Sequence, residues 1–326
     1  MSLPILVAPT CRSIGRASDI LRSGGLVAFP TETVYGLGAD ATSVTAIERL
    51  FKVKNRPACN PLIIHLATID RLSSLAQVDD RTVFLAESLW PGPLTLVLRR
   101  SDDCPVASIA CATSSTIAVR IPAHPVALAL LKKVAKPIAA PSANISGTVS
   151  PTIPLHVTES LGNRVDMILA AGRCQIGIES TVVDLTQEIP MILRPGAITQ
   201  EMLNSLIGPV QTYIPVSGRS DDVLKSPGQL LRHYAPSIPL HLNVTDFHDG
   251  AAVIAFGPDT FIRGGYTRLN LSVTGDLDEA AMNLYSMLRA LDQPQYRMID
   301  VMPIPEQGLG IAINDRLRRA AALKPS

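Results

Sequence analysis

Several features that would place this chain in a common protein class are missing from its 326 residues. No run of 18 or more apolar residues occurs, so we expect no membrane-spanning helix. The first residues lack the charged and apolar segments of a signal peptide. The net charge is +1, which argues against a uniformly basic surface for nucleic acid but leaves a local basic patch open.

Cysteine and histidine patterns also exclude some classes. The five cysteines contain no C-x-x-C pair, which argues against a zinc site or a disulfide framework and favours a reducing cytoplasm. The six histidines show no metal-ligand spacing, so we expect no metal held by the protein itself. The chain contains neither a P-loop nor the G-x-S-x-G motif of serine hydrolases. Gly36 and Gly38 imitate a dinucleotide fingerprint, but residues 30–35 separate them from the preceding strand, so NAD binding is not expected.

The order of apolar segments predicts two domains. Strands alternate with helices over residues 1–212, and several short strands follow one another directly, which predicts a twisted mixed α/β sheet with flanking helices. Residues 213–236 are polar and contain Gly and Pro, so we expect an interdomain linker there. Residues 237–326 then show a strand–helix–strand–helix order, which predicts a smaller Rossmann-like α/β domain.

Cations, an amide and a histidine gather near the ends of the elements expected between residues 44 and 66. Lys54 and Arg56 follow a helical segment, where they either complement the helix dipole or clamp phosphate as a point charge and a bidentate donor. Asn60 lies four residues further on, and His65 falls at the end of the next expected strand. Binding groups concentrate at such ends because rigid elements position them.

Two later turns carry neutral hydrogen-bonding groups. Ser142 and Asn144 either cap a helix or point toward phosphate and ribose oxygens, and Ser150 adds a hydroxyl nearby. Ser180 precedes one strand, and Arg194 ends the next. Each of these signals is weak when taken alone.

Arg120 lies inside the apolar strand expected at 116–121. An arginine in such a strand is costly to bury unless it is paired. The partner is either a structural carboxylate or the carboxylate of a substrate, and the sequence leaves both open.

Seven motifs follow one another along about 200 residues of the chain: PTETVYGLG, KNRPACNPLIIH, WPGPLT, VRIPAHP, APSANISG, ESTVVD and LRPGAI. Taken together, they resemble the YrdC/Sua family of threonylcarbamoyl-adenylate synthases. They occur in the family's order, and the joint match is far more specific than any single motif. The segment 226–236 resembles the linker of the family's longer, two-domain branch.

The resemblance implies a reaction and its partners. L-Threonine, bicarbonate or CO2, and ATP would give threonylcarbamoyl-AMP and pyrophosphate. The product would serve the threonylcarbamoyladenosine modification next to the anticodon of tRNA, completed by downstream transfer enzymes. Mg²⁺ would arrive on the ATP phosphates, since no dedicated carboxylate cluster is visible in the sequence. Direct contact with tRNA stays open, and no membrane partner is expected.

The resemblance also assigns roles to individual residues. It implies a catalytic role for Lys54, Arg56, Ser142 and Asn144. It implies nucleotide binding by Arg56, Asn60, Thr116, Ser142, Ser150 and Arg194, to which we add Tyr234 from the residues of the linker. It implies threonine binding by Thr33, His65, Arg120, Ala140 and Ser180. No metal-binding residue is implied.

Tyr234 is the last residue assigned, and two roles are open to it. In the first, residues 226–236 fold over the N-terminal site and Tyr234 closes on the nucleotide as a lid, which would exclude water from a reactive mixed anhydride. In the second, Tyr234 anchors the second domain.

Two other classes of protein compete with the synthase. One is an RNA-binding module of the YrdC type without adenylating activity of its own. It would need aromatic stacking platforms, but aromatic residues make up only 4% of the chain. The other is a carbamoyl-phosphate-using maturation enzyme, which would carry acylphosphatase-like and zinc-finger segments that this chain lacks.

Overall fold

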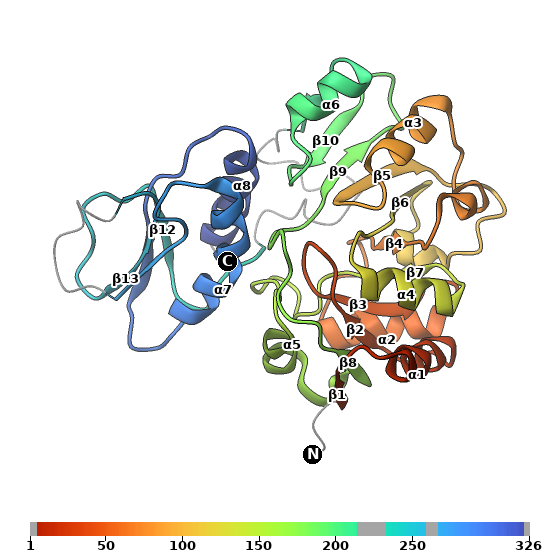
Figure 1. The fold of residues 1–326 in the computed structure, drawn as a ribbon, viewed down its shortest axis with the longest axis horizontal. Coiled ribbons are helices and arrows are strands. Elements are labelled where there is room, and N and C mark those ends of the chain that lie inside the picture. Colours follow the sequence, from red (N-terminus) through yellow and green to blue (C-terminus); the bar gives the residue numbers. More distant parts are fainter. Residues whose placement is uncertain (1–4, 214–232, 259–266, 323–326) are drawn as a thin grey trace.

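The computed structural model describes residues 5–213, 233–258 and 267–322. These residues form two units, each with its own sheet (Figure 1). The larger unit holds the N-terminal part of the chain, and the smaller unit lies to its side in blue. Most of the predicted linker, residues 214–232, lies outside the described residues.

The N-terminal unit is built on one mixed sheet of eleven strands in the order β1-β8-β2-β3-β7-β4-β6-β5-β9-β10-β11. This confirms the predicted mixed α/β fold. The strands are β1 (Ile5–Val7), β2 (Val27–Phe29), β3 (Gly36–Asp40), β4 (Ile63–His65), β5 (Leu94–Arg99), β6 (Thr116–Arg120), β7 (Ile138–Ala139), β8 (Met167–Leu169), β9 (Thr181–Asp184), β10 (Met191–Arg194) and β11 (Gln211–Thr212).

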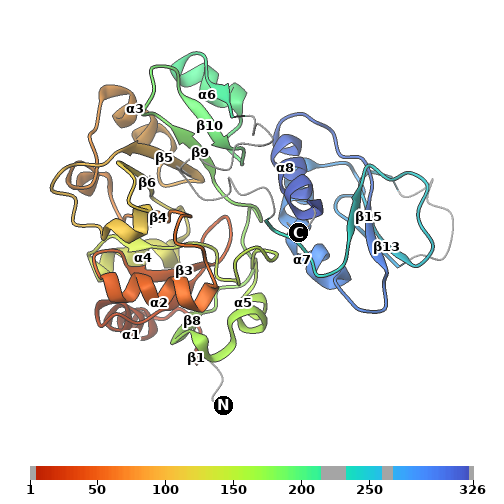
Figure 2. The same ribbon diagram turned by 180° about the vertical axis from the view of Figure 1, so that it is seen from behind.

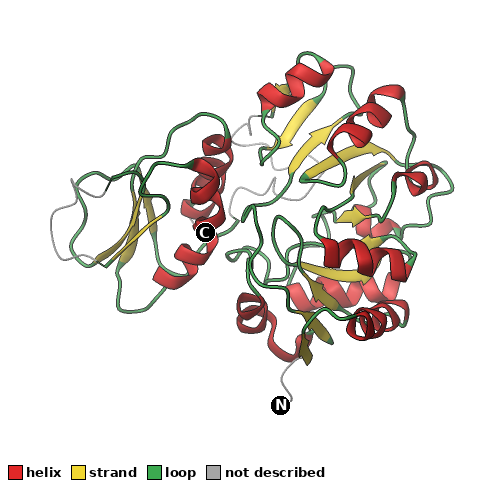
Figure 3. Cartoon of the chain, viewed as in Figure 1, coloured by secondary structure: helices red, strands yellow, loops and turns green. Residues whose placement is uncertain are grey.

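Helices flank this sheet, as Figure 3 shows in red. Side chains start several of them, because Thr10, Ser43, Asp79 and Thr199 each accept a hydrogen bond from the first turn. The α-helices are α1 (Cys11–Arg22), α2 (Val44–Lys54), α3 (Asp80–Leu89), α4 (Pro125–Val134), α5 (Pro154–Leu161) and α6 (Gln200–Ile207), and the 3₁₀ helices are η1 (Ile69–Ser74), η2 (Ser108–Cys111) and η3 (Gly162–Arg164).

Two strand pairings bring the expected site residues together. Strands β4 and β6 run parallel in a register that places His65 beside Arg120. Strands β2 and β3 run antiparallel, and the turn between them is buried rather than solvated. The backbone of this turn is held from outside, because the amide of Tyr35 donates to the carbonyl oxygen of Pro151 at 2.9 Å. Thr33 in this turn accepts a hydrogen bond from Arg120, so the turn lies at the same end of the sheet as His65 and Arg120.

The C-terminal unit is a four-stranded parallel sheet in the order β12-β15-β13-β14, which confirms the predicted Rossmann-like domain. Its helices α7 and α8 lie between that sheet and the N-terminal unit in both views (Figures 1 and 2). The elements are β12 (Leu240–Leu242), β13 (Ala251–Ala255), β14 (Arg268–Asn270), α7 (Leu277–Leu291), β15 (Met298–Val301) and α8 (Leu309–Ala321).

The two units are in direct contact through α7. The guanidinium of Arg289 donates to the carbonyl oxygen of Val149 at 2.5 Å, and the hydroxyls of Thr152 and Ser286 lie 3.0 Å apart. At Gly177, a Cβ would lie 2.5 Å from the Cα of Met282, so only glycine permits this close approach. The interface is thus tightly packed.

Some elements were not anticipated from the sequence. Strand β3 contains two glycines and no β-branched residue, so its composition does not predict a strand. It forms one because it pairs with β2 on one side and β7 on the other. Helix α5 begins at a proline and has eight residues, too few for a clear apolar period. Within the described residues, no helix has the length and apolar character needed to cross a membrane.

Candidate active site

A polar cavity lies where the β2–β3 turn, the ends of β4 and β6, and the residues before β9 converge. It holds about 530 Å³ of empty space, part of which opens to solvent. Its lining includes nine of the residues predicted for the site: Thr33, Arg56, His65, Arg120, Ala140, Ser142, Ser180, Arg194 and Tyr234. The other lining residues are Thr31, Val34, Gly36, Ile63, Pro141, Glu179 and His233.

The remaining five predicted residues do not line this cavity. Lys54 is buried beneath it and donates to the carbonyl oxygens of Ser142 and Asn144 at 2.5 and 2.6 Å. Burial lowers the pKa of Lys54 well below its usual value, with the nearby charge of Arg56 acting in the same direction. In this structure Lys54 therefore braces the loop that carries Ser142. The other four residues outside the lining are Asn60, Thr116, Asn144 and Ser150.

Arg120 has a protein carboxylate as partner. Its Nη2 atom lies 2.6 Å from Oε1 of Glu32, and its Nη1 atom donates to the hydroxyl of Thr33 at 2.9 Å. Both partners are buried in the β2–β3 turn. The second oxygen of Glu32 has no hydrogen-bond partner among the described residues. The pair is thus only partly satisfied, although buried polar groups are usually fully bonded.

His65 lies beside Arg120 and is neutral at physiological pH. Burial lowers its pKa to about 3, and the charge of Arg120 adds to the effect. Its Nδ1 atom lies 3.2 Å from the carbonyl oxygen of Ile63. A neutral imidazole can contribute a hydrogen bond to a ligand without adding charge.

Arg56 is a buried cation that no described carboxylate neutralises. It donates to the carbonyl oxygens of Asn60 and Pro61 and to Oδ1 of Asn60, and all three acceptors are neutral. Burial, as the largest cause, lowers its pKa to about 9. Such a desolvated guanidinium favours an anionic ligand. Asn60 thereby serves to orient Arg56.

Arg194 and Ser180 are bonded to each other on another wall of the cavity. The Nη2 atom of Arg194 donates to the hydroxyl of Ser180 at 3.1 Å, and its Nε atom donates to the Ser180 carbonyl oxygen. The hydroxyl of Thr95 lies 2.8 Å from that of Ser180. Arg194 ends β10 and Ser180 precedes β9, so an antiparallel pairing brings them together.

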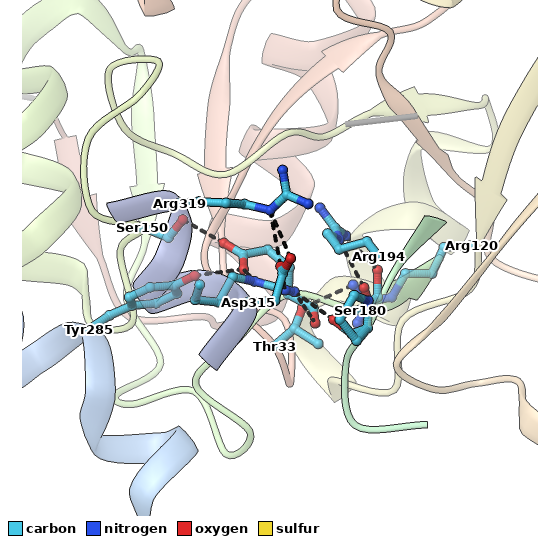
Figure 4. Close-up of polar contacts among 11 residues, drawn as sticks. Thr33, Arg120, Ser150, Ser180, Arg194, Tyr285, Asp315 and Arg319 are labelled. Carbon is cyan, nitrogen blue, oxygen red and sulfur yellow. Dashed lines mark hydrogen bonds and ion pairs between the residues drawn. The ribbon is translucent and has the colours of Figure 1, made fainter. Parts of the chain in front are cut away.

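Glu179 connects this cavity to the C-terminal unit. Figure 4 shows two of the side chains that meet there, Ser150 and Tyr285. Its Oε1 atom accepts from the hydroxyl of Ser150 at 2.6 Å. Its Oε2 atom accepts from the hydroxyl of Tyr285 in α7 at 2.8 Å and from Nε of Arg316 in α8 at 2.9 Å. Burial acts to raise the pKa of Glu179, but the charges of Arg316 and Arg194 outweigh it and lower the pKa to about 2. Ser150 therefore holds Glu179, not the cavity surface, in this structure.

Arg316 is itself fully buried and reaches across the interface. Its Nη2 atom donates to the carbonyl oxygen of Pro195 at 3.0 Å, and its Nη1 atom contacts Asp315 at 2.7 Å. Arg316 is not among the residues predicted from the sequence, because the stretch RLRR resembles a solvated basic helix end. One signal could have found it, since Arg316 lies on the same helical face as Ile313, Leu317 and Ala320.

Tyr234 takes part in both the cavity and the second domain. Its ring stacks on that of Tyr285 with centroids 5.7 Å apart, and Arg316 lies 5.3 Å from its centroid. The neighbouring Ala235 donates its amide to the carbonyl oxygen of Gly147 at 2.9 Å. The polar linker predicted at 213–236 thus ends in a buried, packed segment, because these rings fill the interface. The contacts agree with the anchoring role, and the lid role stays a prediction.

The arrangement suits two anionic groups and a small polar molecule. Three arginines line the cavity, and among the described lining residues Glu179 is the one carboxylate. Glu179 is paired with Arg316, and Glu32 behind the wall is paired with Arg120, so Arg56 and Arg194 leave the cavity with an excess of positive charge. Hydroxyls of Thr33, Ser142 and Ser180 add neutral groups. No described side chain here forms a serine–histidine or cysteine–histidine pair, so the site is built for binding and charge neutralisation rather than for covalent catalysis.

Comparison with known proteins supports this reading. Residues 19–196 match the family described as "Telomere recombination", and residues 198–322 match the one described as "Threonylcarbamoyl-AMP synthase, C-terminal domain". A curated threonylcarbamoyl-AMP synthase of Pyrococcus abyssi is 41% identical, covering 94% of each chain. That of Bacillus subtilis is 38% identical, covering 94% of this chain and 92% of the relative.

A solved structure is similar over nearly the whole chain. It is the crystal structure of P. abyssi Sua5 complexed with L-threonine, with a TM-score of 0.88 and 39% identity, and the match covers 98% of both chains. The likeness extends over both sheets and both family matches. The chain therefore belongs to the threonylcarbamoyl-AMP synthase family, in its two-domain form.

Proposed function

We propose that this protein condenses L-threonine, bicarbonate or CO2, and ATP to threonylcarbamoyl-AMP and pyrophosphate, for the threonylcarbamoyladenosine modification of tRNA. The observation that carries the proposal is the cavity itself. Three buried arginines line it, and two of them, Arg56 and Arg194, donate to neutral acceptors among the described residues, in a chain whose relatives carry this activity. The enzyme is thus a nucleotidyltransferase.

The reaction needs little covalent participation by the protein. The threonine amine takes up CO2 as a carbamate, whose oxygen attacks the α-phosphorus of ATP and displaces pyrophosphate. The protein has to hold two anions in contact and neutralise the charge that develops, which positioned cations do well. A positively charged cavity lined by buried arginines provides those conditions.

We assign the two substrates to opposite sides of the cavity. Arg120, with Thr33, His65, Ala140 and Ser180 around it, would bind threonine, and its guanidinium would exchange part of its contact with Glu32 for the substrate carboxylate. Arg56 and Arg194, with Ser142 and Tyr234, would bind the phosphates and the nucleoside. In this arrangement Lys54, Asn60, Asn144 and Ser150 support the nucleotide side from beneath the surface. Thr116, at the start of β6, would contact the nucleotide from that strand.

Mg²⁺ would enter as part of the ATP substrate. Glu179, the described carboxylate that lines the cavity, already accepts three hydrogen bonds and has no oxygen free for a cation. Mg²⁺ commonly binds through substrate phosphates and keeps several waters, which fits this site. We further propose a cytoplasmic location, from the unpaired cysteines, and a division into domains at 1–212 and 237–326 with a linker between.

One assay tests the proposed function. Purified protein is incubated with labelled bicarbonate, ATP, Mg²⁺ and threonine, and the products are separated for a labelled adenylate and for pyrophosphate. We expect a labelled adenylate that requires threonine and ATP. A matched reaction with D-threonine serves as control. The RNA-binding alternative, a module that binds tRNA without forming an adenylate, would give no labelled adenylate under any condition.

A further inference from the structure

A cluster of two histidines and an aspartate lies in the C-terminal domain, away from the cavity. His241 is on β12, Asp300 is on β15, and His248 follows β12 in the loop that leads to β13. The ligand atoms of the three side chains all lie within 4.8 Å of one another. The spacing of these residues along the chain does not reveal the cluster, because Asp300 is distant from both histidines.

Sheet register creates the cluster. Strands β12 and β15 are parallel neighbours, and His241 pairs directly with Asp300. Their neighbours Leu240, Ile299 and Val301 belong to the core beneath α7 and α8. Since side chains alternate along a strand, His241 and Asp300 project from the opposite face of the sheet. Figures 1 and 2 show that this face points away from the N-terminal unit.

The geometry around Asp300 is that of a carboxylate shared by two imidazoles. The Nδ1 atom of His248 lies 3.0 Å from Oδ2 and 3.1 Å from Oδ1 of Asp300, and the Nδ1 atom of His241 lies 3.5 Å from Oδ1. The backbone amide of His248 also donates to Oδ2 at 2.8 Å, which fixes the loop against the strand. The two imidazole rings lie edge to face, with centroids 5.0 Å apart.

Asp300 is fully buried, whereas the side chains of His241 and His248 are 43% and 51% exposed. A buried carboxylate is costly unless it is paired with a cation or bound to a metal. Each histidine can bond Asp300 through Nδ1 only if that atom carries a proton. A single divalent cation would replace both protons and neutralise the carboxylate at once.

We propose that His241, His248 and Asp300 form a binding site for a divalent transition metal of the Zn²⁺ class. Two imidazoles and one carboxylate are the ligand set that such ions take in open sites, with water or another group completing the coordination. In a tetrahedral site with bonds of about 2 Å, ligand atoms lie roughly 3.3 Å apart. The Nδ1 atoms of His248 and His241, at 3.0 and 3.5 Å from the nearest oxygen of Asp300, are each close to this spacing. The half-exposed histidines can rotate to bring all three ligand atoms, now within 4.8 Å of one another, around one ion.

Metal titration of the full-length protein tests the site. Protein treated with EDTA and dialysed is titrated with ZnCl₂ by calorimetry and with CoCl₂ by visible absorption. We expect one equivalent of metal per protein chain, bound through nitrogen and oxygen atoms. The cobalt spectrum should then lack the thiolate-to-cobalt band that binding at the exposed Cys11 or Cys59 would give. Absence of stoichiometric binding at micromolar metal would overturn the proposal.

Variants locate the binding. Because changes even behind a metal ligand reduce affinity 10–100-fold, we expect His241→Ala and His248→Ala each to weaken Zn²⁺ binding at least about 100-fold. Both residues are partly exposed, so the variants should fold, which circular dichroism would verify. Asp249→Asn, an exposed carboxylate next to the cluster, is the matched control and should bind as the wild type does. Equal affinity in all four proteins would contradict the proposed ligands.

Discussion

Two buried arginine–carboxylate pairs, Arg120–Glu32 and Arg316–Glu179, differ in how completely they are bonded. Glu179 accepts hydrogen bonds at both oxygens, from Ser150 on one and from Tyr285 and Arg316 on the other. Glu32 accepts from Arg120 at one oxygen, and its second oxygen has no partner among the described residues. Both pairs are at least nine-tenths buried, so exposure does not explain the difference.

This difference distinguishes a pair that holds the two domains together from a pair that can bind a ligand. A fully satisfied network in a low-dielectric interior rigidifies the parts that it joins, and Arg316–Glu179 joins the two domains. A partly satisfied pair retains bonding capacity, and Arg120–Glu32 lies on the wall of the cavity. We therefore infer that the first pair is a clamp and that the second exchanges partners when threonine binds. The same substitution, arginine to methionine, can test both.

Arg316→Met should have the largest effect on stability. Removing one partner of a buried pair costs about 3–5 kcal/mol because the charge of the other partner, here Glu179, stays buried without its cation. The measurement is the free energy of unfolding by urea, with Arg318→Met as control. Arg318 pairs with Glu306 on the surface, so its loss should cost less than about 1 kcal/mol. Equal losses in the two variants would break the distinction between clamp and surface pair.

Arg120→Met should cost less stability and remove threonine binding. We expect a loss of about 3 kcal/mol, at the lower end for buried pairs, because the cavity admits water to the charge that is left behind. The double variant Arg120→Met/Glu32→Met should regain most of this stability, since apolar replacement of both partners is often neutral. Urea unfolding checks stability and calorimetric titration checks threonine. A double variant that regained threonine binding along with stability would show that Arg120 has a purely structural role.

Acid should loosen the clamp in a defined window. The pKa of Glu179 is about 2 in the folded protein against an ordinary 4.5, a shift that corresponds to about 3 kcal/mol. Because the folded pKa is depressed, this stability is fully present above pH of about 4.5 and disappears as the pH falls through about 2. Melting temperatures of the wild type and Glu179→Gln should converge over that range. A constant gap between the two would mean that Glu179 is not ionised in the clamp.

Arg56→Ala should leave stability least affected and should mainly reduce the rate. Its acceptors are neutral, so its removal leaves no carboxylate unpaired. Loss of one preorganised charge-stabilising group costs about 2–4 kcal/mol in the transition state. Adenylate formation under single-turnover conditions measures this, with circular dichroism confirming the fold. A folded variant with near-normal rates would remove Arg56 from the phosphate site.

The sequence predicted which residues line the cavity better than it predicted which of them bond to one another. The motifs predicted Arg120 and Thr33 because each lies at a recognisable strand or turn. The order of the strands in the sheet then places the two side chains in contact. Glu32 stood between two threonines in the same motif, but nothing local shows that a turn of polar residues will be buried under another loop. Arg316 lies 137 residues from Glu179, and its helix could be placed while its partner could not.

The same limit applies to Tyr234 and to the second domain. Spacings of three and four residues predicted α7, since periodicity is a local property. The stacking of Tyr234 on Tyr285 depends on how the two domains dock, and no local pattern encodes that. The strands β12 and β14 have three residues each, too few for an alternating pattern to emerge. Contacts between distant segments were therefore the part that only the structure could supply.

Calorimetric titration of L-threonine tests the central distinction most directly. The wild type, Arg316→Met and the double variant Arg120→Met/Glu32→Met would each be titrated at a temperature where all are folded. We predict that the first two release heat on binding threonine, while the double variant shows no saturable heat. Threonine binding by the double variant with the affinity of the wild type would contradict the assignment of the partly satisfied pair as the substrate site.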